Sequence, residues 1–195
     1  MVIEVVGLVG SPRKGMNTDT LVSKVLEGAR SIGAAIKKIY LNDLDIKPCQ
    51  ACDTSPAPEC CFYKDGMDEI YQVLETADVI VIGTPAYYGS ISSQLKLIID
   101  RSNCLTEMIE LADGKVRFQT RIKKKKKGIF IWIADYSRDP GPALASIKYW
   151  LKDVNIELID KIVVTDSDRG QGARMREDLL SKAFEIGRAL ERLGK

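Results

Sequence analysis

The sequence predicts an α/β fold in which helices cover both faces of a parallel sheet. Five strand-like runs alternate with helical stretches along the 195 residues, and this alternation is typical of strands joined by helical crossovers. Polar loops at residues 10–18, 84–89 and 135–141 follow the first, third and fourth runs. Because ligands of open parallel sheets bind at the carboxyl ends of strands, we expect these loops to converge on one ligand.

Turn-like segments separate the expected elements. Residues 42–64 are irregular and contain several prolines and cysteines, and residues 104–120 favour no particular structure. Asp65 is placed to cap the helix that follows it, and Pro142 suits the first turn of another helix. The expected strands are 2–9, 35–41, 79–83, 129–134 and 156–164, and the expected helices are 17–26, 66–76, 90–101, 142–153 and 175–193.

The composition describes one globular domain. Hydrophobic residues make up 45% of the chain and charged residues 29%, and the net charge is +2. This charge is too small to favour polyanions, and the run Lys123–Lys127 has a single arginine, Arg121, beside it, so we expect a solvated turn there. No apolar run approaches the ~20 residues of a membrane span. We expect a cytoplasmic protein, one domain over residues 1–195 with a Cys-rich insert loop at about 47–64, and no nucleic-acid or membrane partner.

The chain contains no histidine. This absence excludes Ser-His and Cys-His nucleophile pairs, histidine metal ligands and imidazole proton shuttles. Chemistry near neutral pH must therefore come from cysteine, lysine, carboxylates or a bound cofactor. We expect no catalytic side chain if a cofactor carries the reaction.

The turn after the first strand has the features of an anion site. The apolar run Val2–Val9 ends at a glycine, and a polar loop leads to a helix that Asn17 or Thr18 is placed to cap. Backbone N–H groups and the positive end of a helix then point to one place, which suits a phosphate. Arg13 offers a planar fork for phosphate oxygens, and Ser11 offers a hydroxyl. An ordinary turn with solvated charges is the competing interpretation.

Two known phosphate motifs do not fit this turn. Gly10–Gly15 has the spacing of a nucleoside-triphosphate loop, but Met16 and Asn17 stand where lysine and serine or threonine are needed. Gly7 and Gly10 are separated by two residues, whereas a dinucleotide fingerprint has one residue there. A single terminal phosphate, such as that of FMN, suits the loop better.

The loop at residues 84–89 has the composition of a surface for a planar ring. Pro85 stiffens it, Tyr87 and Tyr88 offer flat faces, and Gly89 allows a close backbone approach. The competing interpretation is a surface loop with one tyrosine in the core. A phosphate loop on the neighbouring strand favours the ring-binding interpretation.

Four cysteines lie in the irregular segment with the spacing C-x2-C-x7-C-C. Cys49 and Cys52 are close enough in sequence to reach one metal ion, and Cys60 and Cys61 complete a set of four sulfurs. An iron–sulfur cluster, a structural zinc ion and plain thiols that sometimes oxidise remain three open interpretations. Cys104, near a helix end, is expected to be a small buried residue and not a ligand.

Several of these segments together resemble the NAD(P)H-dependent FMN reductase family, and the cysteines that precede Asp65–Ile70 resemble its iron–sulfur flavoprotein branch. The resemblance covers residues 1 to about 103. The segments that carry it are Gly10–Thr18 (GSPRKGMNT), Gly83–Ser92 (GTPAYYGSIS) and Gln94–Lys96 with Asp100 and Arg101.

The resemblance implies a flavodoxin-like three-layer sandwich with a five-stranded parallel sheet of order 2-1-3-4-5. It also implies an FMN site made from two loops. Residues that match the family's phosphate loop are Ser11, Arg13, Asn17 and Thr18, and residues that match its ring loop are Pro85, Ala86, Tyr87, Tyr88 and Gly89.

The cysteines depart from the branch's pattern, in which C-x2-C-x2-C is followed by a fourth cysteine. Cys49, Cys52 and Cys61 match the first, second and fourth positions, but Ser55 occupies the third. Cys60 is extra and would have to replace the missing ligand of a [4Fe–4S] cluster. The family's Gly-rich loop after the fourth strand is also altered, to Asp135–Asp139.

The resemblance implies an FMN-dependent oxidoreductase or electron-transfer flavoprotein. Its cofactors would be FMN, a [4Fe–4S] cluster and NAD(P)H as donor, and the electrons would pass to an external partner such as a ferredoxin. A homodimer or homotetramer is expected. The alternatives are a cluster-free NAD(P)H-dependent FMN or quinone reductase, and a non-catalytic binding protein that docks through the cysteine loop.

Overall fold

A computed structural model describes residues 2–52, 61–136, 139–167 and 172–193. Its main feature is a five-stranded sheet whose neighbouring strands are all parallel. Counted along the chain within this sheet, the strand order is 2-1-3-4-5, so the predicted order is confirmed. In spatial order the strands are β2 (Ala35–Tyr40), β1 (Glu4–Val9), β3 (Val79–Pro85), β6 (Lys126–Ile133) and β7 (Ile156–Val164).

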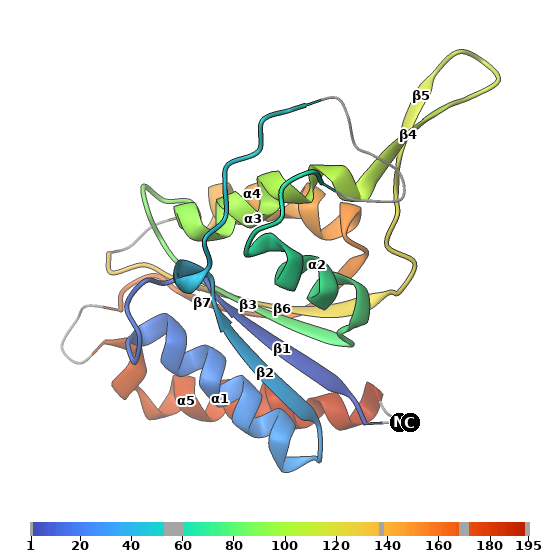
Figure 1. Ribbon diagram of the computed structural model, residues 1–195. Coiled ribbons are helices and arrows are strands. Elements are labelled where there is room, and N and C mark those ends of the chain that lie inside the picture. The colour runs from blue at the N-terminus through green and yellow to red at the C-terminus, as the bar shows by residue number, and fades with distance from the viewer. Residues whose placement is uncertain (1, 53–60, 137–138, 168–171, 194–195) are drawn as a thin grey trace.

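Helices form a layer on each face of the sheet, as predicted (Figure 1). One face packs on α1 (Asn17–Ser31) and α5 (Glu177–Arg188), and the other on α2 (Met67–Thr76), α3 (Ser93–Arg101) and α4 (Gly141–Asp153). In the described parts of the chain, no helix combines the length and the apolar character needed to cross a bilayer.

The alternation of side chains along the strands produces two hydrophobic cores. Val5 and Val9 of β1 belong to the core under α1 and α5, whereas Val6 and Leu8 belong to the core under the other three helices. The central strands are buried on both faces, which explains their nearly continuous apolar sequences. The charged residues that interrupt the second and fifth expected strands lie on β2 and β7, the two edges of the sheet.

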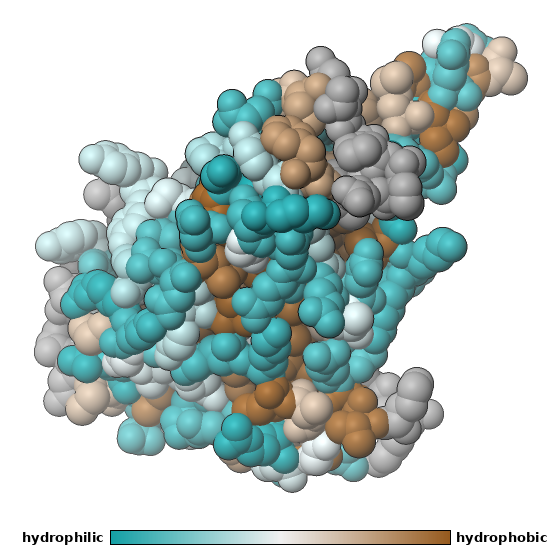
Figure 2. Space-filling model, in the orientation of Figure 1, coloured by the Kyte–Doolittle hydropathy of each residue, from teal (hydrophilic) through white to brown (hydrophobic). Residues whose placement is uncertain are grey.

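Residues 104–120, for which the sequence favoured no structure, form an antiparallel hairpin of β4 (Thr106–Glu110) and β5 (Val116–Thr120). The hairpin stands out from the body of the molecule (Figure 1). Met108 and Phe118 pair across it and are 68% and 65% exposed. Figure 2 shows apolar residues along this projecting arm. The arm has no core of its own, so the usual alternation of buried and exposed residues gave no signal in the sequence.

The expected solvated turn at Lys123–Lys127 is wrong for its last two residues, because β6 begins at Lys126. Lys126 is also buried, with only 1% of its surface exposed. Its Nζ donates to the carbonyl oxygen of Lys124 at 3.0 Å. Burial disfavours the charged form and lowers the pKa of Lys126 to about 8. Lys124 and Lys127 remain at the surface, in ion pairs with Asp78 and Glu157.

We expect the substitution Lys126→Met to raise the free energy of unfolding at pH 7 by about 1–3 kcal/mol. In the wild type the folded state loses the lysine proton near pH 8 and the unfolded chain near its ordinary pKa of about 10.4. The free energy of unfolding of the wild type should therefore rise between about pH 8 and pH 10.4. The difference in this free energy between the variant and the wild type should become smaller over the same range. Urea unfolding at pH 7, 8.5 and 10 measures this, with the exposed Lys125→Met as control. If the free energies of unfolding of Lys126→Met and the wild type differ by the same amount at all three pH values, the expectation is contradicted.

Candidate functional site

The loop at residues 10–16 connects the carboxyl end of β1 to α1, next to the end of β3. The N–H of Gly10 donates to the carbonyl oxygen of Gly83 at 2.7 Å and so ties the two strand ends together. At Gly83 a Cβ atom would lie 2.4 Å from Cγ2 of Val22 and 3.0 Å from Cγ2 of Thr18. The missing side chain therefore lets the start of α1 rest directly against the end of β3.

The structure brings the four expected phosphate-loop residues into one turn. Ser11 and Thr18 are buried, and Arg13 is exposed at the surface. The Ser11 hydroxyl accepts a hydrogen bond from the Arg13 N–H at 3.2 Å, which tightens the loop. The N–H groups of the first turn of α1, at Asn17 and Thr18, have no acceptor within the helix and carry its positive dipole end.

The expected side-chain cap by Asn17 or Thr18 is wrong. Met16 holds the N-cap position of α1 and makes no side-chain hydrogen bond there. Asn17 is the first helical residue, and its Oδ1 accepts from the N–H of Arg174 at 3.1 Å. Its side chain therefore joins the loop to the segment before α5, a contact across 157 positions that no local rule predicts.

Asp19, which the sequence analysis did not single out, fixes the loop at residues 10–16 to the start of α1. Its buried carboxylate accepts from the Gly15 N–H at 2.7 Å, from Lys38 Nζ at 2.8 Å and from the Tyr40 hydroxyl at 2.9 Å. Burial opposes ionisation, but the hydrogen bonds from Lys38, Gly15 and Tyr40 keep the pKa of Asp19 below its ordinary value. An acidic residue in the first turn of a helix is the only local signal for it.

The second expected loop forms a tight turn at residues 87–90. The Ser90 N–H donates to the Tyr87 carbonyl oxygen at 3.0 Å, and the φ angles of Tyr88 and Gly89 are 52° and 77°. Positive φ at both central positions is the geometry of a type I′ turn. It suits Gly89 but strains Tyr88, whose side chain is fully exposed. Such strain marks functional loops when the surroundings hold it in place.

Three hydrogen bonds hold the base of this turn. The buried Thr84 Oγ1 accepts from the Ser92 N–H at 2.9 Å, and the indole N–H of Trp132 donates to the Ser90 carbonyl oxygen at 3.0 Å. The Ala86 N–H donates to the carbonyl oxygen of Ile133 at 2.7 Å. The strained tip therefore stands on a rigid base made by β3 and β6.

The second and third expected loops meet at a cavity of about 350 Å³. Asp135 is fixed there by the Ser167 hydroxyl, which donates to its Oδ1 at 2.6 Å. Tyr87 and Tyr136 expose aromatic faces beside it, and Pro85 ends β3 at its base. Residues 137 and 138 of the third loop lie outside the described residues. The cavity is lined by Ala86, Tyr87, Tyr88, Gly89, Ala134, Asp135 and Tyr136.

A second cavity, of about 360 Å³, gathers three of the four expected cysteine ligands. Cys49 and Cys52 are exposed, Cys61 is half-buried, and Cys60, like Ser55, lies outside the described residues. The half-buried Cys104 lines the same cavity, and its Sγ donates to the Tyr71 hydroxyl at 3.3 Å. Within the described ranges, no three cysteine or acidic side chains are grouped closely enough to hold a metal ion.

Arg101 lies behind this cysteine cavity and is 2% exposed. Its Nη1 and Nη2 donate to the two carboxylate oxygens of Asp65 at 2.7 and 3.2 Å, and Nη2 lies 3.6 Å from the Cys61 sulfur. Burial opposes ionisation of Asp65, but the hydrogen bonds from Arg101 and from the N–H groups of Lys47 and Met67 together keep the pKa of Asp65 below its ordinary value. Asp65 Oδ1 also accepts from the Met67 N–H at 3.0 Å, but Gly66 holds the N-cap position of α2, so Asp65 lies one residue before the position predicted for it.

Two buried guanidinium nitrogens at the cysteine cavity have no hydrogen-bond partner among the described residues, the Nε atoms of Arg101 and Arg121. An unpaired buried donor costs about 1–3 kcal/mol, and more when the group is charged. Both donors suit an anion. Cysteine thiols and unpaired cationic N–H groups therefore meet at one cavity, and these are the donors that a thiolate-bound cluster with a net negative charge would need.

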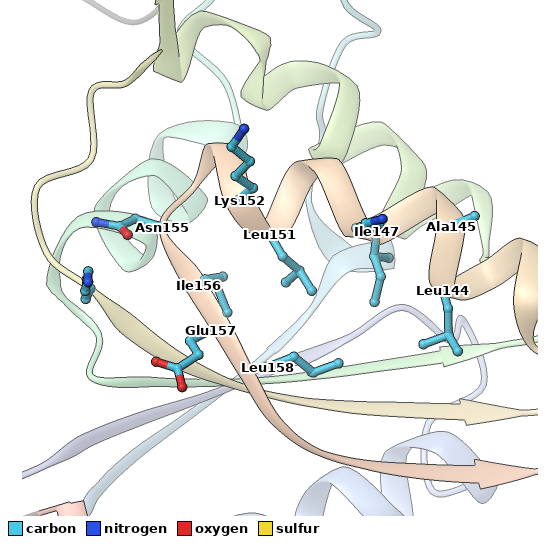
Figure 3. Close-up of a pocket in the computed structure, with 11 residues that line it drawn as sticks. Leu144, Ala145, Ile147, Leu151, Lys152, Asn155, Ile156, Glu157 and Leu158 are labelled. Atoms are coloured by element: carbon cyan, nitrogen blue, oxygen red, sulfur yellow. The ribbon is translucent and has the colours of Figure 1, made fainter. Parts of the chain in front are cut away.

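A third cavity, of about 690 Å³, lies between α4 and β7 and contains none of the expected site residues. Figure 3 shows Leu144, Leu151 and Leu158 directed into the space between the helix and the strand. Its lining combines these apolar side chains with polar residues such as Lys148 and Glu157, and it includes Ile156, the first residue of β7. It is therefore at the opposite end of the sheet from the three loops.

The sequence matches the family model described as NADPH-dependent FMN reductase over residues 3–123, more than half of the chain. A curated "iron-sulfur flavoprotein" from Methanosarcina thermophila is 35% identical over 100 residues, 51% of this chain and 52% of that protein. Another, from Archaeoglobus fulgidus, is 41% identical over 96 residues, 48% of this chain and 45% of that protein. The chain thus spans about half the length of the curated relatives it matches.

Solved structures with low sequence identity share the fold. An NAD(P)H:quinone oxidoreductase from Methanothermobacter marburgensis has a TM-score of 0.75 at 16% identity, covering 97% of this chain and 100% of that one. A flavodoxin from the domain Archaea has a TM-score of 0.56 at 11% identity, covering 98% of both chains. The fold is therefore flavodoxin-like, as the resemblance implied.

We expect Asp19→Asn to lower the free energy of unfolding by about 1–3 kcal/mol at pH 7, because Lys38 and Tyr40 lose an ionised acceptor. Since the folded-state pKa of Asp19 is lowered, its stabilising contribution is present above the unfolded pKa of about 3.9 and is lost as the pH falls below it. In urea unfolding from pH 7 to pH 3, the free energy of unfolding of the variant should fall less with decreasing pH than that of the wild type. Asp43→Asn, which removes an exposed partner of Lys14, should cost under about 1 kcal/mol.

Proposed function

This chain belongs to the NADPH-dependent FMN reductase family, and from that membership we propose that it is an FMN-dependent oxidoreductase. In this proposal NAD(P)H is the donor, and electrons pass from FMN through a [4Fe–4S] cluster in the cysteine loop to an external redox protein such as a ferredoxin. The observation that carries the proposal is the tie between the ends of β1 and β3. These two strand ends lead into the loop at residues 10–16 and toward the turn at residues 87–90, where Tyr87 and Tyr88 are exposed.

We assign the FMN phosphate to the loop at residues 11–18. Ser11 and Thr18 place hydroxyl groups there, and Arg13 lies close enough in the loop to fold its guanidinium over phosphate oxygens. The negative charge of Asp19 does not compete, because Lys38 and Tyr40 already bind its carboxylate. The first-turn N–H groups of α1, including that of Asn17, add the dipole contribution.

We assign the isoalloxazine ring to the cavity formed by Pro85–Gly89 and residues 134–136. FMN, when bound, supplies a ring that accepts two electrons, so the chain needs no acid or base of its own. The part of the protein is to hold the ring. The backbone of the 87–90 turn offers N–H groups at its edge, and Tyr87, Tyr88 and Tyr136 offer faces that shield it from water.

The cluster ligands in this proposal are Cys49, Cys52 and Cys61, with Cys60 in place of the cysteine that Ser55 replaces. Ser55 also favours the second candidate function, a cluster-free NAD(P)H-dependent FMN or quinone reductase. Both functions are compatible with a homodimer or homotetramer, which the exposed apolar side chains of the β4–β5 hairpin support.

We expect Arg13→Ala to weaken FMN binding by about 10- to 100-fold, since a hydrogen bond to a charged group contributes about 1.5–3 kcal/mol. Quenching of FMN fluorescence on binding measures the affinity. Riboflavin, which has no phosphate, should bind wild type and variant equally. The matched control is Lys14→Ala, because the neighbouring Lys14 ammonium is occupied by Asp43 at 2.6 Å. Equal affinity of the wild type for FMN and riboflavin would overturn the assignment of the phosphate loop.

We expect protein purified without oxygen and reconstituted with iron and sulfide to contain iron, and Cys61→Ser to lose it while retaining FMN. The control is Cys104→Ser, which lines the same cavity but lies outside the proposed ligand set. Iron analysis and the visible spectrum decide the outcome. A wild type that binds FMN without iron would contradict the cluster, and rapid NAD(P)H oxidation by a quinone in that protein would establish the second candidate function.

A further inference from the structure

We propose that Arg101 is a positioning residue for the cysteine site, which it serves in two ways. It fixes both ends of the cysteine loop, and its guanidinium, with that of Arg121, provides positive N–H donors that stabilise a negatively charged sulfur site and raise its reduction potential. The proposal rests on the cluster proposed above, but the contacts that carry it belong to the chain itself.

The first role follows from the residues that Arg101 contacts. Nη1 donates to the Lys47 carbonyl oxygen at 2.7 Å, just before Cys49, and the guanidinium binds Asp65 through two hydrogen bonds, just after Cys61. These two points bracket the cysteine loop. Because Arg101 is the last residue of α3, a helix of the core holds Lys47 and Asp65, which lie on either side of the cysteines.

The second role follows from the donors that remain. Nη2 of Arg101 lies 3.6 Å from the Cys61 sulfur, within hydrogen-bonding range for sulfur, and Nε of Arg101 is buried without a partner among the described residues. Nε of Arg121, which lines the same cavity, is also buried without a hydrogen-bond partner among the described residues. Hydrogen bonds to ligand sulfurs and nearby positive charge favour the more reduced, more negative state of a cluster.

A purely structural ion pair makes a different prediction. If Arg101 served only to neutralise Asp65, Arg121→Gln, which leaves that ion pair intact, would leave the reduction potential of the sulfur site unchanged. The ion pair with Asp65 leaves Nε without a partner, and it does not explain why a second buried Nε lies at the same cavity. The reduction potential is therefore the measurement that separates the two roles.

The test compares reconstituted wild type, Arg101→Gln, Arg101→Lys and Arg121→Gln by an EPR-monitored redox titration. We expect Arg101→Gln to lower the equilibrium constant for one-electron reduction of the cluster by at least tenfold. This corresponds to a reduction potential that is lower by at least 59 mV. Arg101→Lys keeps the positive charge but lacks the planar guanidinium, so it should lower the reduction potential by a smaller amount. Arg117→Gln, an exposed hairpin arginine that binds Gln119, is the control. An unchanged potential in Arg101→Gln overturns the proposal.

Two further outcomes are also decisive. If Arg101→Gln does not fold, shown by loss of FMN binding, Arg121→Gln is used instead, and an unchanged potential there overturns the proposal. If the wild type binds FMN but forms no cluster, the proposed cluster fails, and Co²⁺ alone is titrated with the thiolate-to-Co²⁺ charge-transfer band as readout. A tenfold weaker Co²⁺ affinity in Arg101→Gln than in Arg117→Gln then supports the role of Arg101, and equal affinities overturn it.

Discussion

The hydrogen bond from Gly10 to Gly83 marks the constraint on which the rest of the structure depends. At this point the chain order reverses, because β2 lies on one side of β1 and β3 on the other. The connections after β1 and β3 therefore leave toward opposite faces of the sheet, one into α1 and one toward α3. A crevice at the carboxyl end of the strands follows from this topology, and both loops of the proposed FMN site border it.

Buried charges have the same function at two loops of this protein. Asp19 holds the phosphate-type loop through Gly15, and Arg101 holds the cysteine loop through Lys47 and Asp65. In each case a helix supplies the charged residue, and its hydrogen bonds attach neighbouring backbone to the core. Removing one partner leaves the other charge buried, which makes such pairs costly to break.

The sequence was sufficient for the fold and for the loops, because strand composition and the order of elements are local properties. The positions of Ser11, Arg13 and the 84–89 loop followed from the same local patterns. The sequence analysis missed the structural roles of Asp19 and Arg101, because their hydrogen-bond partners are distant in sequence. It missed the burial of Lys126, because a charged residue is normally expected at the surface. The cap expected from Asn17 was wrong for the same reason, because its side chain is bound by Arg174.

The β4–β5 hairpin gives the cysteine cavity a wall with little support of its own. Met108 and Phe118 line the cavity from the arm, and Arg121 lines it from the arm's base. An isolated pair of strands is only marginally stable in water, so the angle of the arm depends on what it rests against. A molecule that bound Met108 or Phe118 on the arm would therefore also contact the wall of the cysteine cavity.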